Sequence, residues 1–173
     1  MANVAHPLFA RLERQLELVR RELANAAEAD RRFGALRRRA ARRPSARGPY
    51  HEWSHNAALA DGIAAIYTGI ESILESVGNE IDDYSPRGAA AHAELVDGMA
   101  VAVAGLRPAV LGEATRDLMH ELRKFRHVAR HKYALELRRR DVGRNFALAK
   151  KLLPAFERDW RRFVKAMVED DSR

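Results

Sequence analysis

The sequence contains no cysteine, and it has only six prolines and ten glycines among its 173 residues. Without a thiol the chain cannot form a disulfide framework, supply a thiolate nucleophile or bind zinc through cysteine. A reducing cytoplasm permits this composition. Few residues are of the kind that separates short strands by turns, which favours helices. In addition, 47% of the residues are hydrophobic and 32% are charged, as in a globular protein.

A targeting or membrane segment is also missing from the pattern. Residues 1–6 lack the basic region and apolar run of a secretory signal. The longest weakly polar stretch, residues 98–105, is far shorter than the ~20 apolar residues that a membrane-spanning helix needs. We therefore expect one cytoplasmic domain spanning residues 1–173, with no membrane association, which buries roughly 70% of its unfolded surface.

Acidic residues are absent from residues 31–51, which carry eight arginines, and the whole chain has a net charge of +7. This balance is compatible with a polyanionic partner, because cations that neutralise phosphates release counterions. We interpret residues 36–49 as an arginine-rich linker. It is either a solvated connection or an arm, from Arg37 to Arg47, that grips a nucleic-acid backbone.

Apolar residues recur at steps of three and four throughout the chain, which predicts an all-α, antiparallel bundle of about five helices. A long helix is expected within residues 1–35, and a helical core within residues 50–165. The clearest stripe marks a central core helix and consists of Leu59, Ile63, Ile66, Ile70, Ile73, Val77 and Ile81. Pro154 is expected to kink the last helix or to mark the start of its main part.

The most informative segment, residues 125–133, places an arginine, a histidine and a tyrosine on one predicted helix: Arg126, His131 and Tyr133. Cleavage of RNA without a metal needs a base to take the 2′-hydroxyl proton and a cation to stabilise the charged phosphate. His131 titrates near neutrality and suits the first task. Arg126 stays protonated, and its planar fork fits phosphate oxygens.

Helix geometry separates these side chains. At ~100° per residue, Arg126 and Tyr133 lie within ~20° of each other, whereas His131 lies ~140° from Arg126. Convergence requires a helix distortion or end at the motif, a long arginine that reaches round, or a second subunit, and we favour the dimer. The competing interpretation is that both residues belong to the basic, solvated flank of the helix.

Histidines on the same helix offer a metal site as an alternative. His127 and His131 lie one turn apart, and His120 lies two turns before His127, a spacing that can hold zinc. No cysteine is available and no carboxylate follows on that stripe, so we interpret them as solvent-facing and expect neither a metal site nor a cofactor.

Two further pairs have structural interpretations. Tyr67 and Glu71 flank the central stripe, and we favour a surface pair over one that points toward the motif helix. Trp53 and Trp160 can stack on bases, but their positions favour the core or an interface.

Residues 50–164 resemble the HepT-like branch of the HEPN-domain ribonuclease toxins. The similarity includes residues 67–74 and 107–108, and its most specific part is the motif of residues 125–133. The resemblance implies a helical bundle that forms a homodimer with a composite RNA cleft between the two motif helices. It also implies that Arg126 and His131 are the catalytic pair. Tyr133 corresponds to the tyrosine that a cognate minimal nucleotidyltransferase antitoxin modifies with AMP from ATP.

The implied function is a toxin-type, metal-independent endoribonuclease, neutralised by that modification. Basic residues beside the catalytic pair are expected to contact RNA; they are Arg123, His127, Arg130 and Lys132. His127 stands where an asparagine is frequent in the family, which leaves the substrate preference open. The alternative is a non-catalytic HEPN module that binds a nucleotidyltransferase or a nucleic acid.

Overall fold

The computed structural model describes residues 7–42, 52–131 and 137–170, and these contain five helices. The helices are α1 (Pro7–Arg42), α2 (Glu52–Glu80), α3 (Ala91–Met99), α4 (Glu113–His131) and α5 (Arg139–Asp170). Across the described ranges, the one strand-like pairing is an isolated antiparallel bridge between Val103 and Arg107. The predicted all-α bundle of about five helices is therefore confirmed.

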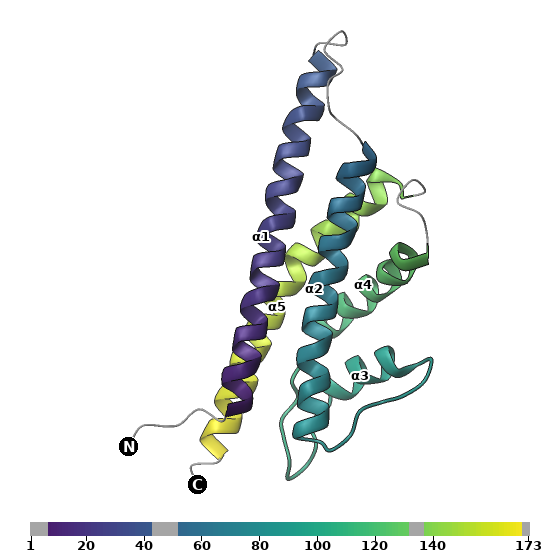
Figure 1. Cartoon of the computed structure of the whole chain (residues 1–173). Coiled ribbons are helices and arrows are strands. Elements are labelled where there is room, and N and C mark those ends of the chain that lie inside the picture. Colours follow the sequence, from purple (N-terminus) through teal and green to yellow (C-terminus); the bar gives the residue numbers. More distant parts are fainter. Residues whose placement is uncertain (1–6, 43–51, 132–136, 171–173) are drawn as a thin grey trace.

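Helix α2 stands at the centre of the bundle and contacts each of the other four helices (Figure 1). α1 lies along one side of α2 and runs in the opposite direction, whereas α3 and α4 lie on the other side. α5 passes behind α2 and contacts both α1 and α4. We refer below to the α1 side and the α3–α4 side of α2.

The predicted apolar stripe of α2 forms the centre of the core. Its residues from Leu59 to Val77 are each at most 3% exposed, and Ile81 packs against them from the end of the helix. Burial of each such side chain contributes roughly 1.5–3 kcal/mol. Among the described helices, α2, rather than residues 98–105, is the one with a long apolar stretch. By length and composition it is able to cross a membrane, but 56% of its most apolar window is buried inside the bundle, as in a core helix.

Small residues let α1 and α2 approach closely. A Cβ atom added at Gly62 of α2 would lie 2.7 Å from the Cβ atom of Ala26 on α1. A Cβ atom at Gly69, two turns further, would overlap the side chain of Val19. Glycine at these positions therefore sets the distance between the two long helices.

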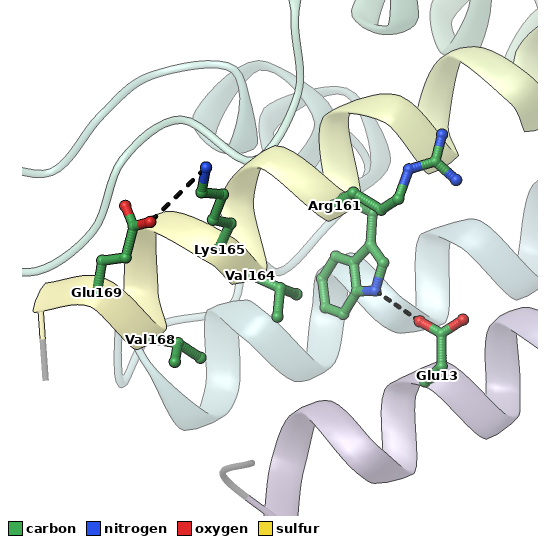
Figure 2. Close-up of a pocket in the computed structure, with 7 residues that line it drawn as sticks. Glu13, Arg161, Val164, Lys165, Val168 and Glu169 are labelled. Carbon is green, nitrogen blue, oxygen red and sulfur yellow. Dashed lines mark hydrogen bonds and ion pairs between the residues drawn. The ribbon is translucent and has the colours of Figure 1, made fainter. Parts of the chain in front are cut away.

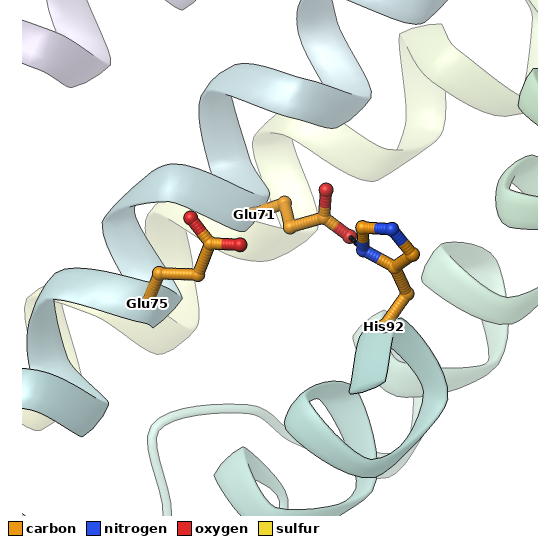
Figure 3. Close-up of side chains that lie close together, drawn as sticks. All are labelled: Glu71, Glu75 and His92. Atoms are coloured by element: carbon orange, nitrogen blue, oxygen red, sulfur yellow. Dashed lines mark hydrogen bonds and ion pairs between the residues drawn. The ribbon is translucent and has the colours of Figure 1, made fainter. Parts of the chain in front are cut away.

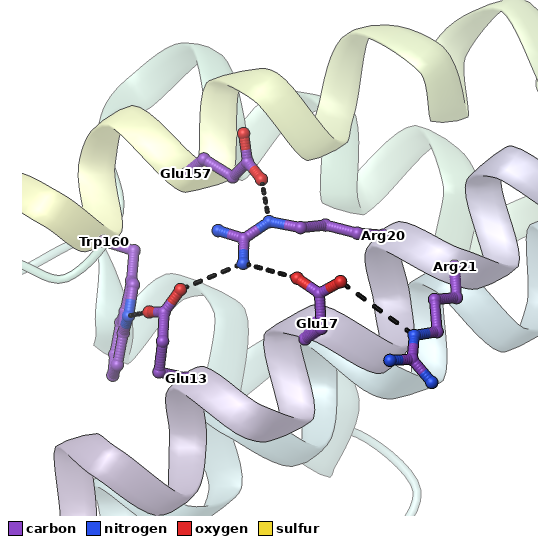
Figure 4. A network of polar contacts seen from close by, with 6 residues as sticks. All are labelled: Glu13, Glu17, Arg20, Arg21, Glu157 and Trp160. Atoms are coloured by element: carbon purple, nitrogen blue, oxygen red, sulfur yellow. Dashed lines mark hydrogen bonds and ion pairs between the residues drawn. The ribbon is translucent and has the colours of Figure 1, made fainter.

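Charged residues connect α1 to α5 (Figure 4). Arg20 of α1 donates to Glu157 of α5 at 2.7 Å, and to Glu13 and Glu17 of its own helix at 3.0 and 3.1 Å. The bond to Glu157, helped by the other two carboxylates, raises the pKa of Arg20 above its usual value. The indole of Trp160 donates to Glu13 at 3.2 Å, so the network extends over both helices.

An open groove lies beside this network, near the last turns of α5 (Figure 2). Its volume is about 470 Å³, and its apolar lining comes from Trp160, Val164 and Val168. Glu13 closes it on the α1 side, while Lys165 and Glu169 form an ion pair at 3.7 Å along its rim.

A buried arginine holds the connections on either side of α3. Arg107 donates to both carboxylate oxygens of Asp82, at 2.6 and 2.8 Å, and to the carbonyl oxygen of Val101 at 2.9 Å. Asp82 follows α2 and Val101 follows α3, so one guanidinium joins both loops. This bidentate pair fixes α3 against the end of α2.

Three expectations differ from the structure wholly or in one of their alternatives. α1 continues to Arg42, so residues 36–42 of the predicted linker are helical, because alanine and arginine are strong helix formers. Residues 43–49 lie outside the described residues. Trp53, in the first turn of α2, is 52% exposed and so lies outside the core, which leaves its placement at an interface as a prediction, whereas Trp160 is buried as expected. Pro154 lies inside α5, which begins fifteen residues earlier, at Arg139, so it does not mark the start of the helix, and the kink stays a prediction.

Candidate active site

The motif helix α4 is anchored at both its start and its inner face. At the start, Asp159 of α5 accepts hydrogen bonds from the backbone N–H of Gly112 at 2.8 Å and from the hydroxyl of Thr115 at 2.5 Å. A carboxylate at this end complements the helix dipole. Along the inner face, Met119, Leu122 and Phe125 are buried in the core.

The guanidinium of Arg126 faces α2. Its side chain is 13% exposed, and its Nη2 atom lies 3.6 Å from Oε2 of Glu71. The guanidinium carbon stands 5.5 Å from the ring centre of Tyr67, within the range of a cation–π contact. Arg126 is therefore a largely buried cation that contacts Glu71 and Tyr67. The competing prediction, that it belongs to a solvated helix flank, is wrong.

Tyr67 and Glu71 are correspondingly not a surface pair. Tyr67 is fully buried and Glu71 is 3% exposed, because α4 covers the face of α2 that carries them. A carboxylate tolerates such burial when cations pair with it. The less favoured prediction, in which this pair points toward the motif helix, is confirmed.

A third helix contributes a partner for the same carboxylate. Nδ1 of His92, near the start of α3, lies 2.8 Å from Oε1 of Glu71 (Figure 3). Glu71 is thus shared between an arginine of α4 and a histidine of α3. No spacing in the sequence points to His92, because only the fold brings residues 21 positions apart into contact.

Burial also changes the titration of Tyr67. Desolvation raises the pKa of its hydroxyl above the usual value, and the negative charge of Glu71 adds to the effect. Among the residues that the structure describes, this hydroxyl makes no hydrogen bond of standard geometry, although the Glu71 carboxylate lies near enough to act on it. Tyr67 therefore presents a neutral hydroxyl beside the Glu71 carboxylate.

The predicted RNA-contacting residues fall into two groups. Arg123 is half-buried and His127 is exposed, and both lie on α4 within one turn of Arg126. The side chain of Arg130 and the whole of Lys132 lie outside the described residues. The same holds for the side chain of His131, the last residue of α4, and for Tyr133, so their placement relative to Arg126 stays a prediction.

The histidine interpretation needs one correction. Nε2 of His120 lies 2.8 Å from Oδ1 of Asp97 on α3, so His120 contacts the neighbouring helix instead of simply facing solvent. His127 is exposed, as expected.

The fold and this junction define an all-α helical domain with a buried arginine–glutamate pair on its motif helix. A family model described as HepT-like protein matches residues 58–167, which is more than half of the chain. The chain therefore belongs to the HepT-like family of HEPN proteins. Neither a curated protein nor a solved structure shows a significant match to it.

Proposed function

We propose that this HepT-like protein is a toxin-type, metal-independent endoribonuclease with Arg126 and His131 as its catalytic pair. The observation that carries the proposal is the placement of Arg126, whose guanidinium is held by Glu71 in a largely buried position on the motif helix. A guanidinium carries five N–H groups, so a single contact with Glu71 leaves others for phosphate oxygens.

In this mechanism, His131 removes the proton of an RNA 2′-hydroxyl, and the oxygen attacks the adjacent phosphorus. Arg126 stabilises the negative charge that develops on the phosphate oxygens. The bond from phosphorus to the 5′-oxygen breaks, and that oxygen takes a proton from solvent. The products are a 2′,3′-cyclic phosphate and a 5′-hydroxyl end, and His131 then releases its proton.

The remaining parts of the proposal follow from the family. The protein acts in the cytoplasm as a homodimer, in which each motif helix completes a cleft with its twofold mate. RNA backbone contacts come from Arg123, His127, Arg130 and Lys132. A cognate nucleotidyltransferase antitoxin joins Tyr133 to the α-phosphate of ATP, and pyrophosphate leaves. The added anionic nucleotide then blocks the phosphate site by bulk and by charge.

The decisive test is cleavage of RNA by the purified protein in excess EDTA, with analysis of the ends. We expect cyclic-phosphate ends from the wild type, and loss of both cleavage and growth inhibition in Arg126→Ala and His131→Ala. Arg116→Ala is the matched control, because Arg116 is an arginine of the same helix that pairs with its near neighbours Asp117 and Glu113 and lies outside the Glu71 pair. Wild-type cleavage by either motif variant would refute the site.

The alternative is a non-catalytic module that binds a nucleotidyltransferase or a nucleic acid. The pairing of Arg126 with Glu71 is the observation that favours this alternative, because an arginine in such an ion pair also stabilises the junction of α2 and α4. Binding of RNA or of the nucleotidyltransferase without any cleavage in EDTA would support the module. A mass increase on Tyr133 after incubation with ATP and the nucleotidyltransferase tests the modification in either case.

A further inference from the structure

Donor groups of the kind that bind metal ions gather beside Arg126. The carboxylates of Glu71 and Glu75 and the imidazole of His92 each offer one donor atom, and these three atoms lie within 4.8 Å of one another. Figure 3 shows the two glutamates one turn apart on α2, with His92 facing them from α3. The cluster is separate from the histidines of α4.

We propose that Glu71, Glu75 and His92 form a binding site for a divalent transition-metal ion of the zinc class. Two carboxylates with one imidazole are a donor set that such ions accept, and water completes the coordination. Donors bound at 2.0–2.2 Å lie roughly 3–4 Å apart around a tetrahedral ion. Small side-chain rotations therefore suffice to close the observed cluster around an ion.

The scaffold of this site is rigid. Glu71 and Glu75 project from the same face of the buried helix α2, since residues four apart lie one above the other. His92 stands near the start of α3, and the contacts of Arg107 with both loops that flank α3 hold that helix in place. Rigid helices keep donor atoms at a fixed separation.

A second observation points to a missing partner at the same place. The hydroxyl of Tyr67 is fully buried one turn before Glu71, close enough for this carboxylate to add to the effect of burial in raising its pKa, but it makes no hydrogen bond of standard geometry within the described part of the chain. A buried hydroxyl without a well-formed hydrogen bond is costly. A water bound to the ion would give this hydroxyl a partner.

The site shares Glu71 with Arg126, which couples metal binding to the proposed catalytic arginine. An ion that takes the Glu71 carboxylate competes with Arg126 for it, so Arg126 loses the group that orients it. This consequence rests on the proposed ribonuclease function, and it predicts that the ion slows cleavage. The binding site itself does not depend on that function.

Binding can be measured with Co²⁺ as a coloured substitute for zinc, on full-length protein stripped with EDTA and then dialysed. We expect a visible absorption band that saturates at one equivalent and disappears on addition of Zn²⁺. Glu75→Gln and His92→Gln should each weaken Co²⁺ binding at least about tenfold, which corresponds to 1.4 kcal/mol. Glu94→Gln, an exposed glutamate of α3, is the matched control and should bind like the wild type.

Three results would overturn the site: no Co²⁺ band, binding by Glu75→Gln that equals the wild type, or binding that only His127→Gln removes. In a separate cleavage assay, Zn²⁺ should slow the wild type but not Glu75→Gln, while both cut RNA equally in EDTA. A protein that binds Co²⁺ as predicted but never cuts RNA refutes the ribonuclease function alone. A protein that cuts RNA but binds no Co²⁺ refutes the metal site alone.

Discussion

An arginine pairs with glutamate on each side of α2, but the number of acidic groups around that arginine differs between the two sides. On the α1 side, Arg20 is surrounded by three carboxylates, and its side chain remains 34% exposed. On the α3–α4 side, the carboxylate of Glu71 is shared by Arg126 and His92 and is almost completely buried, with Glu75 one turn further along α2. An arginine whose N–H groups are taken up by three acids is suited to joining helices. An arginine that makes a single contact with a shared acid keeps N–H donors for a phosphate.

The sharpest way to break this comparison is to replace each arginine by lysine, which keeps the charge but removes the planar fork. Arg126→Lys should lower RNA cleavage by roughly 10²–10³-fold, the loss typical of a removed charge-stabilising donor. Arg20→Lys should leave the rate unchanged, because it lies on the other side of α2. Initial rates of RNA cleavage in EDTA measure both effects. Equal rates for the two variants would show that the two arginines do not differ in function.

The free energy of unfolding should depend more on the carboxylate of Glu71 than on that of Glu157. Glu71→Gln leaves a largely buried arginine without its counter-charge, and we expect a loss of roughly 1.5–3 kcal/mol in the free energy of unfolding. Glu157→Gln should cost less than about 1 kcal/mol, because Arg20 is partly solvated and keeps two other acids. Urea unfolding followed by circular dichroism gives both values. A larger loss for Glu157→Gln would contradict the assignment.

On the α1 side of α2, close helix packing should contribute more to stability than charge pairing. In Gly62→Ala the new methyl group meets Ala26, and we expect a net loss of about 1 kcal/mol after the better helix propensity of alanine is included. Gly98→Ala in α3 adds a methyl group where nothing lies within 4 Å, so it should be neutral or slightly stabilising. The urea midpoint of Gly62→Ala should therefore fall, whereas that of Gly98→Ala should stay the same or rise.

The smallest effect concerns the buried hydroxyl of the α3–α4 side. Burial holds the pKa of Tyr67 above 10.0, the usual value for tyrosine, so the unfolded chain loses this proton first as the pH rises. Stability is therefore present below about pH 10 and decreases above it. Tyr67→Phe should reduce this alkaline loss, whereas Tyr84→Phe, at an exposed position, should not. Thermal melts between pH 8 and 11 would compare them; identical alkaline slopes for Tyr67→Phe and the wild type would contradict the prediction.

Much of the fold follows from spacing along the chain. The stripe from Leu59 to Val77 predicts the central helix because a repeat of three and four residues puts every apolar side chain on one face. The end of α1 was harder to predict, because Gly34 and a run of like charges suggest a linker while alanine and arginine favour a helix. The candidate site was predicted only in part. Arg126 was found from the motif, but the roles of Glu71 and His92 depend on which helices pack together.

By itself, the sequence determined the helical class, the central stripe, the family and the arginine of the motif helix, since all of these depend on local spacing and residue type. Only the tertiary structure decided that Tyr67 and Glu71 are buried and that Glu71 meets both Arg126 and His92. Periodicity indicates which residues share a face of one helix. It does not indicate which other helix covers that face, and the pairing of buried charges depends on that choice.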